Sequence, residues 1–145
     1  MFEQKVFCIG FQKTGTTSLG EALGLLGYSV TGPNFLTNQD LENRVYDLAL
    51  AITEKYDAFQ DNPWPLLYKE MDQKFPGSKF ILTQRPVDKW IDSVVRHFGS
   101  RETAMRRWIY DAGCPEGNED TYTERYERHN REVLELSLIH ISEPT

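Results

Sequence analysis

Apolar residues along the chain form two kinds of run, short β-branched runs and longer stretches with helical spacing. The first short run covers residues 6–9 and ends at Gly10. From Leu19 onward, apolar residues follow at i, i+3, i+4 and i+7, which is the spacing of one helix face. This pattern predicts a strand, a glycine-containing loop and a helix that ends at Gly27.

The same alternation continues along the chain. We expect further strands at residues 28–31, 56–61 and 79–84, and further helices at residues 40–55, 65–75, 86–98, 102–112 and 121–135. Strands that alternate with helices indicate an α/β fold with three layers, in which a mainly parallel β-sheet is flanked by helices on both faces. No internal repeat or domain boundary interrupts the pattern, so residues 1–135 are expected to form a single domain.

Composition narrows the class of protein. The 145 residues carry a net charge of −6 with no long run of either sign, which disfavours a nucleic-acid partner. Cys8 and Cys114 do not make a disulfide framework. The first strand begins close to Met1, leaving no room for a signal peptide, and no apolar run approaches the roughly 20 residues that span a bilayer. We therefore expect a cytoplasmic protein without a membrane segment.

The last ten residues, 136–145, resemble the translation of an adapter used in preparing sequencing libraries. We expect this segment to be an artefactual tail and exclude its residues, including His140, from functional argument. The natural sequence would then stop near Glu135, and a C-terminal part of the domain would be missing. The alternative is a native, strand-like tail at residues 138–141.

The loop after the first strand has the residue types of an anion site. Free N–H groups and the positive end of the helix dipole meet at the start of the following helix, so phosphate or sulfate is the expected ligand. Gly10 and Gly15 have the spacing of the P-loop pattern G-x-x-x-x-G-K-[ST], but Thr16 stands where that pattern has lysine. The lysine is instead Lys13. The alternative interpretation is an ordinary strand-to-helix turn rich in glycine and threonine.

Residues 13–18 resemble the 5′-phosphosulfate loop of the sulfotransferases that use 3′-phosphoadenosine 5′-phosphosulfate (PAPS). A second stretch, residues 85–93, is similar to the segment with which that family binds the 3′-phosphate: Arg85 ends a strand and Ser93 lies on the next helix. A guanidinium group binds phosphate through two parallel hydrogen bonds, and a hydroxyl group can donate another. The alternative is that Arg85 pairs with Asp88 and Ser93 is solvated.

The resemblance covers residues 5–98, and the chain departs from the family's pattern at several points. Gln12 replaces the usual proline before the lysine, and Ser18 replaces a frequent aromatic residue. The family's later basic, glycine-rich donor-binding loop has no match, in agreement with a truncated chain.

The resemblance implies transfer of a sulfuryl group from PAPS to a hydroxyl or amine of a small-molecule or glycan acceptor, with no metal required. In this interpretation Lys13 neutralises charge on the oxygen that bridges phosphate and sulfate. The donor-binding residues that it implies are Lys13, Thr14, Gly15, Thr16, Thr17, Ser18, Arg85 and Ser93.

A base must remove the proton of the acceptor, and the resemblance implies a histidine or glutamate between the two motifs. No histidine lies between Ser18 and Arg85, so Asp61, at the end of a predicted strand, is the candidate. Asp61 can equally be a strand-end cap that bonds the turn at Asn62. Glu70 is a weaker candidate, and His97 is interpreted as solvated.

Other residues admit two interpretations. Arg101, Arg106 and Arg107 can attract an anionic acceptor such as a sugar acid, but a solvated helix face is the simpler account. The three tryptophans can line an acceptor pocket or, more simply, belong to the core: Trp64, Trp90 and Trp108. The competing functions are a P-loop kinase or nucleotide hydrolase, and a non-catalytic nucleotide-binding module.

Overall fold

The computed structural model describes residues 4–36 and 38–142, with residues 137–142 described by their backbone alone. The described residues contain a four-stranded sheet in the order β2-β3-β1-β4, and every neighbouring pair is parallel. Its strands are β1 (Val6–Cys8), β2 (Val30–Thr31), β3 (Ala58–Phe59) and β4 (Lys79–Ile81). The predicted α/β fold with a parallel sheet is therefore confirmed.

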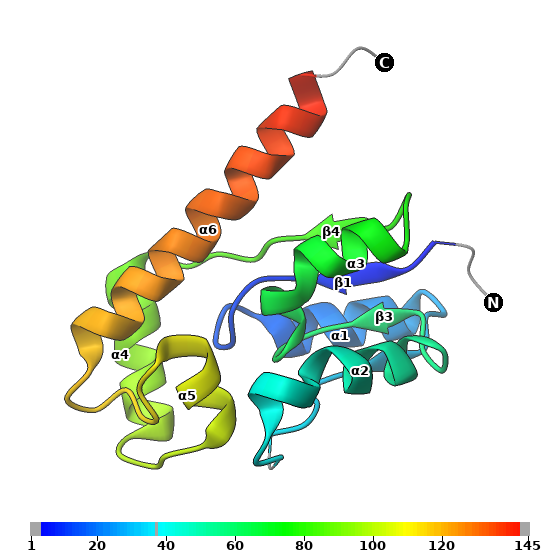
Figure 1. The fold of residues 1–145 in the computed structure, drawn as a ribbon. Coiled ribbons are helices and arrows are strands. Elements are labelled where there is room, and N and C mark those ends of the chain that lie inside the picture. Colours follow the sequence, from blue (N-terminus) through cyan, green and yellow to red (C-terminus); the bar gives the residue numbers. More distant parts are fainter. Residues whose placement is uncertain (1–3, 37, 143–145) are drawn as a thin grey trace.

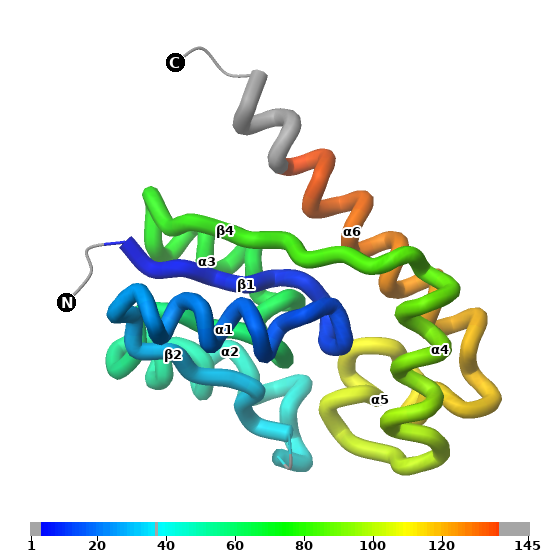
Figure 2. Tube along the Cα trace, turned by 180° about the vertical axis from the view of Figure 1, so that it is seen from behind, coloured from blue at the N-terminus to red at the C-terminus, as the bar shows by residue number. Residues whose placement is uncertain are grey.

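Helices cover both faces of this sheet. They are α1 (Thr16–Leu25), α2 (Leu41–Thr53), the 3₁₀ helix η1 (Trp64–Leu67), α3 (Tyr68–Lys74), α4 (Val87–Phe98), α5 (Ala104–Tyr110) and α6 (Glu119–Ser142). Figures 1 and 2 show α1 on one face and α2 and α3 on the other, while α4, α5 and the first part of α6 lie beyond the carboxyl ends of the strands.

The buried run of β1 explains why both faces need cover. Successive side chains of a strand point to opposite faces. Phe7 stacks against Phe59 and Phe80 of the neighbouring strands, with ring centroids 4.8 and 5.4 Å away, in the larger core cluster. Val6 and Cys8 belong to a smaller cluster that includes Leu23 of α1. Because both faces of β1 are buried, the strand is a continuous apolar run and does not alternate with polar residues.

Several predicted boundaries change in the structure. The helix expected at residues 65–75 begins as the 3₁₀ helix η1, and the last helix extends from Glu119 to Ser142 instead of ending near residue 135. The backbone of residues 138–141 is helical and not strand-like. Asp40 occupies the N-cap position of α2, and its carboxylate accepts a hydrogen bond from the side chain of Asn43.

His129 joins α6 to the end of β1. Its side chain is buried, its Nε2 donates to the carbonyl oxygen of Ile9 at 2.7 Å, and its ring stacks on Phe11 with centroids 4.6 Å apart. Burial disfavours the charged imidazolium and lowers the pKa of His129 to about 4, although the bond to Ile9 acts in the opposite direction. The folded protein therefore keeps this side chain neutral over a range in which a solvated histidine becomes charged.

This difference in pKa predicts a loss of stability in weak acid. Between its ordinary pKa near 6.5 and its folded pKa of about 4, His129 binds a proton in the unfolded chain but not in the folded one. The stabilisation should be complete above pH 6.5 and should fall by about 3 kcal/mol as the pH falls to 4. Urea unfolding from pH 4 to 8 measures the effect.

The variant His129→Gln should flatten this pH dependence, because glutamine keeps an N–H donor for Ile9 but does not titrate. The control His97→Gln, at an exposed position, should leave most of the dependence in place. Other titrating groups, including carboxylates, remain in all three proteins, so each protein keeps some dependence of stability on pH. Equal slopes in the wild type and His129→Gln would contradict the prediction.

Candidate functional site

The loop between β1 and α1 turns through two residues with positive φ, Lys13 at 65° and Gly15 at 88°. Glycine adopts this left-handed conformation without steric cost, whereas a lysine in it is unusual. Gly15 is the N-cap of α1, and its carbonyl accepts the N–H of Leu19. The N–H groups of the first turn have no partner within the helix, so they are available to an anion in the loop.

The loop is fixed against the end of β4. A Cβ atom on Gly10 would lie 2.0 Å from the hydroxyl oxygen of Thr83 and 2.5 Å from its carbonyl oxygen, so only glycine fits. The hydroxyl of Thr14 donates to the carbonyl of Phe11 at 2.5 Å, and it therefore accepts from the Thr83 hydroxyl at 2.7 Å. Thr14 supports the loop from within with its side chain.

Arg85 connects the exit of β4 to the loop and to α6. Its guanidinium Nη1 donates to the carbonyl of Lys13 at 3.0 Å. Its backbone N–H donates to the hydroxyl oxygen of Tyr126 at 2.8 Å, and that hydroxyl donates to the carbonyl of Arg85 at 3.0 Å. The alternative of an ion pair with Asp88 is wrong, because none forms in the part of the chain that the structure describes. The other N–H groups of the guanidinium fork remain for a ligand.

Helix α4 contacts the loop. Trp90 and Val94 on its apolar side are fully buried, and the indole N–H of Trp90 donates to the carbonyl of Gln12 at 2.8 Å. Ser93 and His97 of the same helix line a cavity. The expectation that helical phase leaves Ser93 free to meet a ligand therefore agrees with the structure.

The sequence motifs converge on this cavity of about 590 Å³. It is bounded by the loop, the exits of β3 and β4, α4 and the start of α5. Its walls contain Gln12, Lys13, Gly15, Thr16, Thr17, Ser18, Pro33, Leu36, Asp61, Asn62, Arg85, Ser93, His97, Phe98, Thr103, Met105 and Arg106. The structure thus brings together all the predicted site residues except Thr14, whose hydroxyl is engaged inside the loop.

Positive charge dominates the cavity. Lys13, Arg85 and Arg106 contribute cations, and Asp61 is the one carboxylate among the described residues that line it. Lys13 is the largest cause of a lowered pKa at His97, which places the two groups in the same electrostatic environment. Such a cavity favours an anionic ligand.

Asp61 follows β3 in the left-handed region, with φ of 66°. Burial raises the pKa of its carboxyl group, and two favourable interactions partly offset this: the backbone N–H of Asn62 donates to its Oδ1 at 2.7 Å, and Lys13 attracts it. The structure therefore contains the capping bond of one interpretation and the cavity position of the other.

The orientation of α5 differs from the prediction. A solvated helix face that includes Arg106 was the simpler expectation, but Arg106 is 8% exposed and lines the cavity. Arg107 is exposed and pairs with Glu102 at 2.9 Å. The buried residues of this helix are Met105, Arg106, Ile109 and Tyr110. Of the tryptophans, Trp64 and Trp90 are core residues and Trp108 is partly buried against the core.

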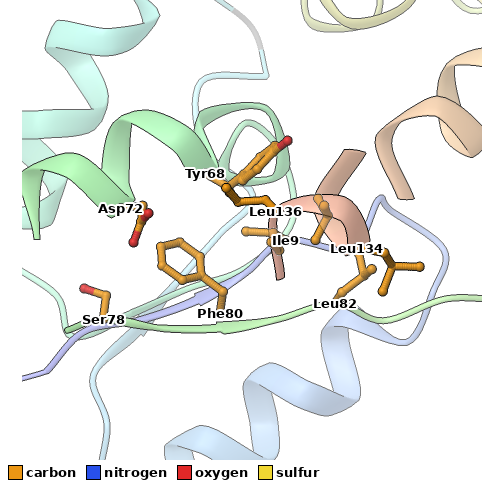
Figure 3. A pocket seen from close by; sticks show the side chains of 9 residues that line it. Ile9, Tyr68, Asp72, Ser78, Phe80, Leu82, Leu134 and Leu136 are labelled. Carbon is orange, nitrogen blue, oxygen red and sulfur yellow. The ribbon is translucent and has the colours of Figure 1, made fainter. Parts of the chain in front are cut away.

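A second cavity of about 360 Å³ lies between β4, α3 and α6. Figure 3 shows apolar side chains around it, including Ile9, Phe80 and Leu136, with Asp72 at its edge. Asp72 is its only charged residue among those described, and a carboxylate repels an anion. The cavity at the loop is therefore the better candidate for the functional site.

Two features are absent from the described part of the chain. Among the side chains that the structure describes, in residues 4–36 and 38–136, no group of three or more His, Cys, Asp or Glu is arranged to hold a metal ion. No helix in residues 4–36 and 38–142 has both the length and the apolar character needed to cross a membrane.

A parallel sheet whose glycine loop and helix N-terminus open into a basic cavity defines an anion-binding α/β domain. The family model described as the sulfotransferase domain matches residues 5–116, which include every residue that lines this cavity. The chain therefore belongs to the sulfotransferase domain family. No curated protein matches it in a comparison of sequences.

Proposed function

We propose that this protein transfers a sulfuryl group from PAPS to a hydroxyl or amine of an acceptor. The observation that carries the proposal is the common cavity of the loop at residues 13–18, Arg85 and Ser93, in which cations outnumber carboxylates. Family membership supports sulfotransfer, and PAPS as the donor is our inference from the loop and the arginine–serine pair.

The two phosphates of the donor would use different parts of the cavity. The N–H groups at the start of α1 and the hydroxyls of Thr16, Thr17 and Ser18 suit the 5′-phosphate. Arg85 suits the 3′-phosphate, because its hydrogen bond to the Lys13 carbonyl holds the guanidinium beside the loop before any ligand arrives. Ser93 adds a hydroxyl from α4.

The chemistry is a displacement at sulfur. A bond forms between the acceptor atom and sulfur, the bond from sulfur to the bridging oxygen breaks, and 3′-phosphoadenosine 5′-phosphate (PAP) leaves with the electron pair. Lys13 neutralises the charge that develops on the bridging oxygen. Asp61 accepts the proton of the acceptor, and its raised pKa makes it a stronger base than an ordinary aspartate.

A kinase or nucleotide hydrolase is the competing enzyme. Its P-loop lysine follows the second glycine, whereas this position is Thr16 and the lysine is Lys13, in a loop that matches the sulfotransferase domain. A nucleotide-binding module without catalysis would use the same cavity, and it differs only in showing no turnover with any acceptor.

Donor binding can be tested by thermal unfolding of the protein with PAP, AMP or magnesium-ATP. PAP at about 100 times its dissociation constant should stabilise the fold by about 2.7 kcal/mol, enough to raise the melting temperature by several degrees. Arg85→Ala should weaken PAP binding by about 10- to 100-fold, because it removes charge-assisted hydrogen bonds to phosphate.

The matched control is Arg96→Ala. Arg96 is an exposed arginine on α4 that pairs with Asp92 at 2.7 Å and does not line the cavity, so PAP binding should be unchanged. Preference for magnesium-ATP would favour the kinase. A cooperative unfolding transition that PAP does not shift would refute the donor site.

A further inference from the structure

Arg106 is a buried cation without a carboxylate partner. Its Nε donates to the carbonyl of Gly113 at 3.2 Å and its Nη2 donates to the carbonyl of Arg101 at 2.7 Å. Among the residues that the structure describes, no carboxylate lies within ion-pair distance of it. Burial without an opposite charge is costly, and it lowers the pKa of this arginine.

The two carbonyls account for only part of the hydrogen-bonding capacity of this guanidinium group. The group has five N–H donors, and Nη1 has no hydrogen-bond partner in the described part of the chain. Its central carbon lies 4.5 Å from the centroid of the Phe98 ring, which restrains the plane of the fork. Arg106 is therefore held in a fixed orientation on the wall of the cavity with donors to spare.

The surroundings of Arg106 differ from those of the proposed donor site. The donor residues come from the β1–α1 loop, the exit of β4 and the middle of α4. Arg106 comes from α5, and the neighbouring lining residues are Phe98, Thr103 and Met105. An aromatic ring and a methionine beside a cation suit a molecule with an apolar body and one anionic group.

We propose that Arg106 binds an oxyanion of the acceptor, so that the acceptor is a hydroxyl- or amine-bearing molecule with a carboxylate or sulfate group. This inference rests on the proposed function and specifies the substrate class of the same cavity. The bound oxyanion supplies the opposite charge that Arg106 lacks in the protein itself. A neutral acceptor of the same shape leaves this cation uncompensated in the complex.

The test compares matched probes on the protein saturated with PAP. One pair is 4-hydroxyphenylacetate and 4-hydroxyphenylacetamide, and a second is glucuronate and glucose. Binding is measured as the additional shift in melting temperature over a concentration series. In at least one pair the anionic member should bind about tenfold tighter than the neutral member, because it adds hydrogen bonds to a charged group.

The variant Arg106→Gln should remove this discrimination while PAP still binds. Arg106→Lys, which keeps the charge but loses the fork, should retain part of it. The matched control is Arg107→Gln, which removes the next arginine on the same helix, an exposed residue paired with Glu102. It should discriminate as the wild type does. Because Arg106 also bonds two backbone carbonyls, Arg106→Lys and the wild-type probe pairs carry the test if Arg106→Gln does not fold.

Failure of this inference can be separated from failure of the proposed function. A wild-type protein that does not bind PAP fails the proposed function and the inference with it. A protein that binds PAP but binds both members of each pair equally, or neither, overturns the inference alone. Discrimination that survives Arg106→Gln also overturns it. If Arg106→Gln lowers the affinity for PAP as much as it lowers the affinity for the anionic probe, Arg106 binds the sulfuryl donor and not the acceptor.

Discussion

Replacing Asp61 by asparagine should lower turnover by about 10²- to 10⁴-fold, the usual contribution of a general base, and should leave PAP binding nearly unchanged. Asparagine keeps an oxygen that can accept the N–H of Asn62, a bond of 2.7 Å in the structure. It also tolerates the left-handed φ of 66° at this position. The substitution therefore removes the base with little disturbance of the turn.

The pH profile tests the same role independently of the size of the effect. A base acts in its deprotonated form, so kcat/KM of the wild type should rise as the pH increases through the pKa of Asp61. Burial raises that pKa above its ordinary value, so the rise should occur at higher pH than for a solvated aspartate. In Asp61→Asn this limb of the profile should disappear. Release of PAP measures both quantities.

The control for this experiment is Asp72→Asn, which changes a half-buried carboxylate at the second cavity and should leave turnover and its pH profile intact. Under the capping interpretation Asp61→Asn retains turnover, because asparagine keeps an oxygen that accepts the N–H of Asn62. That result would remove Asp61 from the mechanism. A wild type that binds PAP but shows no turnover with any acceptor would favour the non-catalytic module.

The sheet and the shared cavity could be predicted because local features determine them. Both faces of β1 are buried, so its sequence is an uninterrupted apolar run, and Gly10 and Gly15 mark the loop that follows. The carboxyl ends of parallel strands meet at one edge of a sheet. Residues placed after three strands, including Lys13, Asp61 and Arg85, consequently line one cavity, although their spacing in sequence says nothing about distance.

The orientation of α5 could not be predicted, because tertiary contacts determine it. The helix spans only Ala104–Tyr110, too short for its apolar spacing to select one face. Tyr110 stacks on Tyr122 of α6 with ring centroids 3.7 Å apart, and Arg106 bonds carbonyls on both sides of the helix. These contacts rotate Arg106 inward. For the same reason the bond from His129 to Ile9, 120 residues away, has no signal in the sequence.

Replacing Lys13 by methionine should lower turnover by about 10²- to 10³-fold, the range observed when one group that stabilises developing charge is removed. Methionine has similar length and no charge, and it leaves the backbone carbonyl that accepts from Arg85 in place. Lys13 itself adopts the left-handed region, which a non-glycine residue occupies at a cost, and such strain is typical of functional positions. Measuring kcat and the dissociation constant of PAP separates chemistry from binding.

The ratio of the two effects identifies what Lys13 does. If it acts on the bridging oxygen as the bond to sulfur breaks, kcat falls and PAP affinity changes little, because the interaction is made mainly in the transition state. If it only helps to hold the phosphate, PAP affinity falls and kcat at saturating donor is retained, which would contradict the assigned role. Lys13→Arg should restore part of kcat. Lys89→Met, at an exposed lysine on α4 outside the cavity, should alter neither quantity, because its charge is solvated and lies away from the donor.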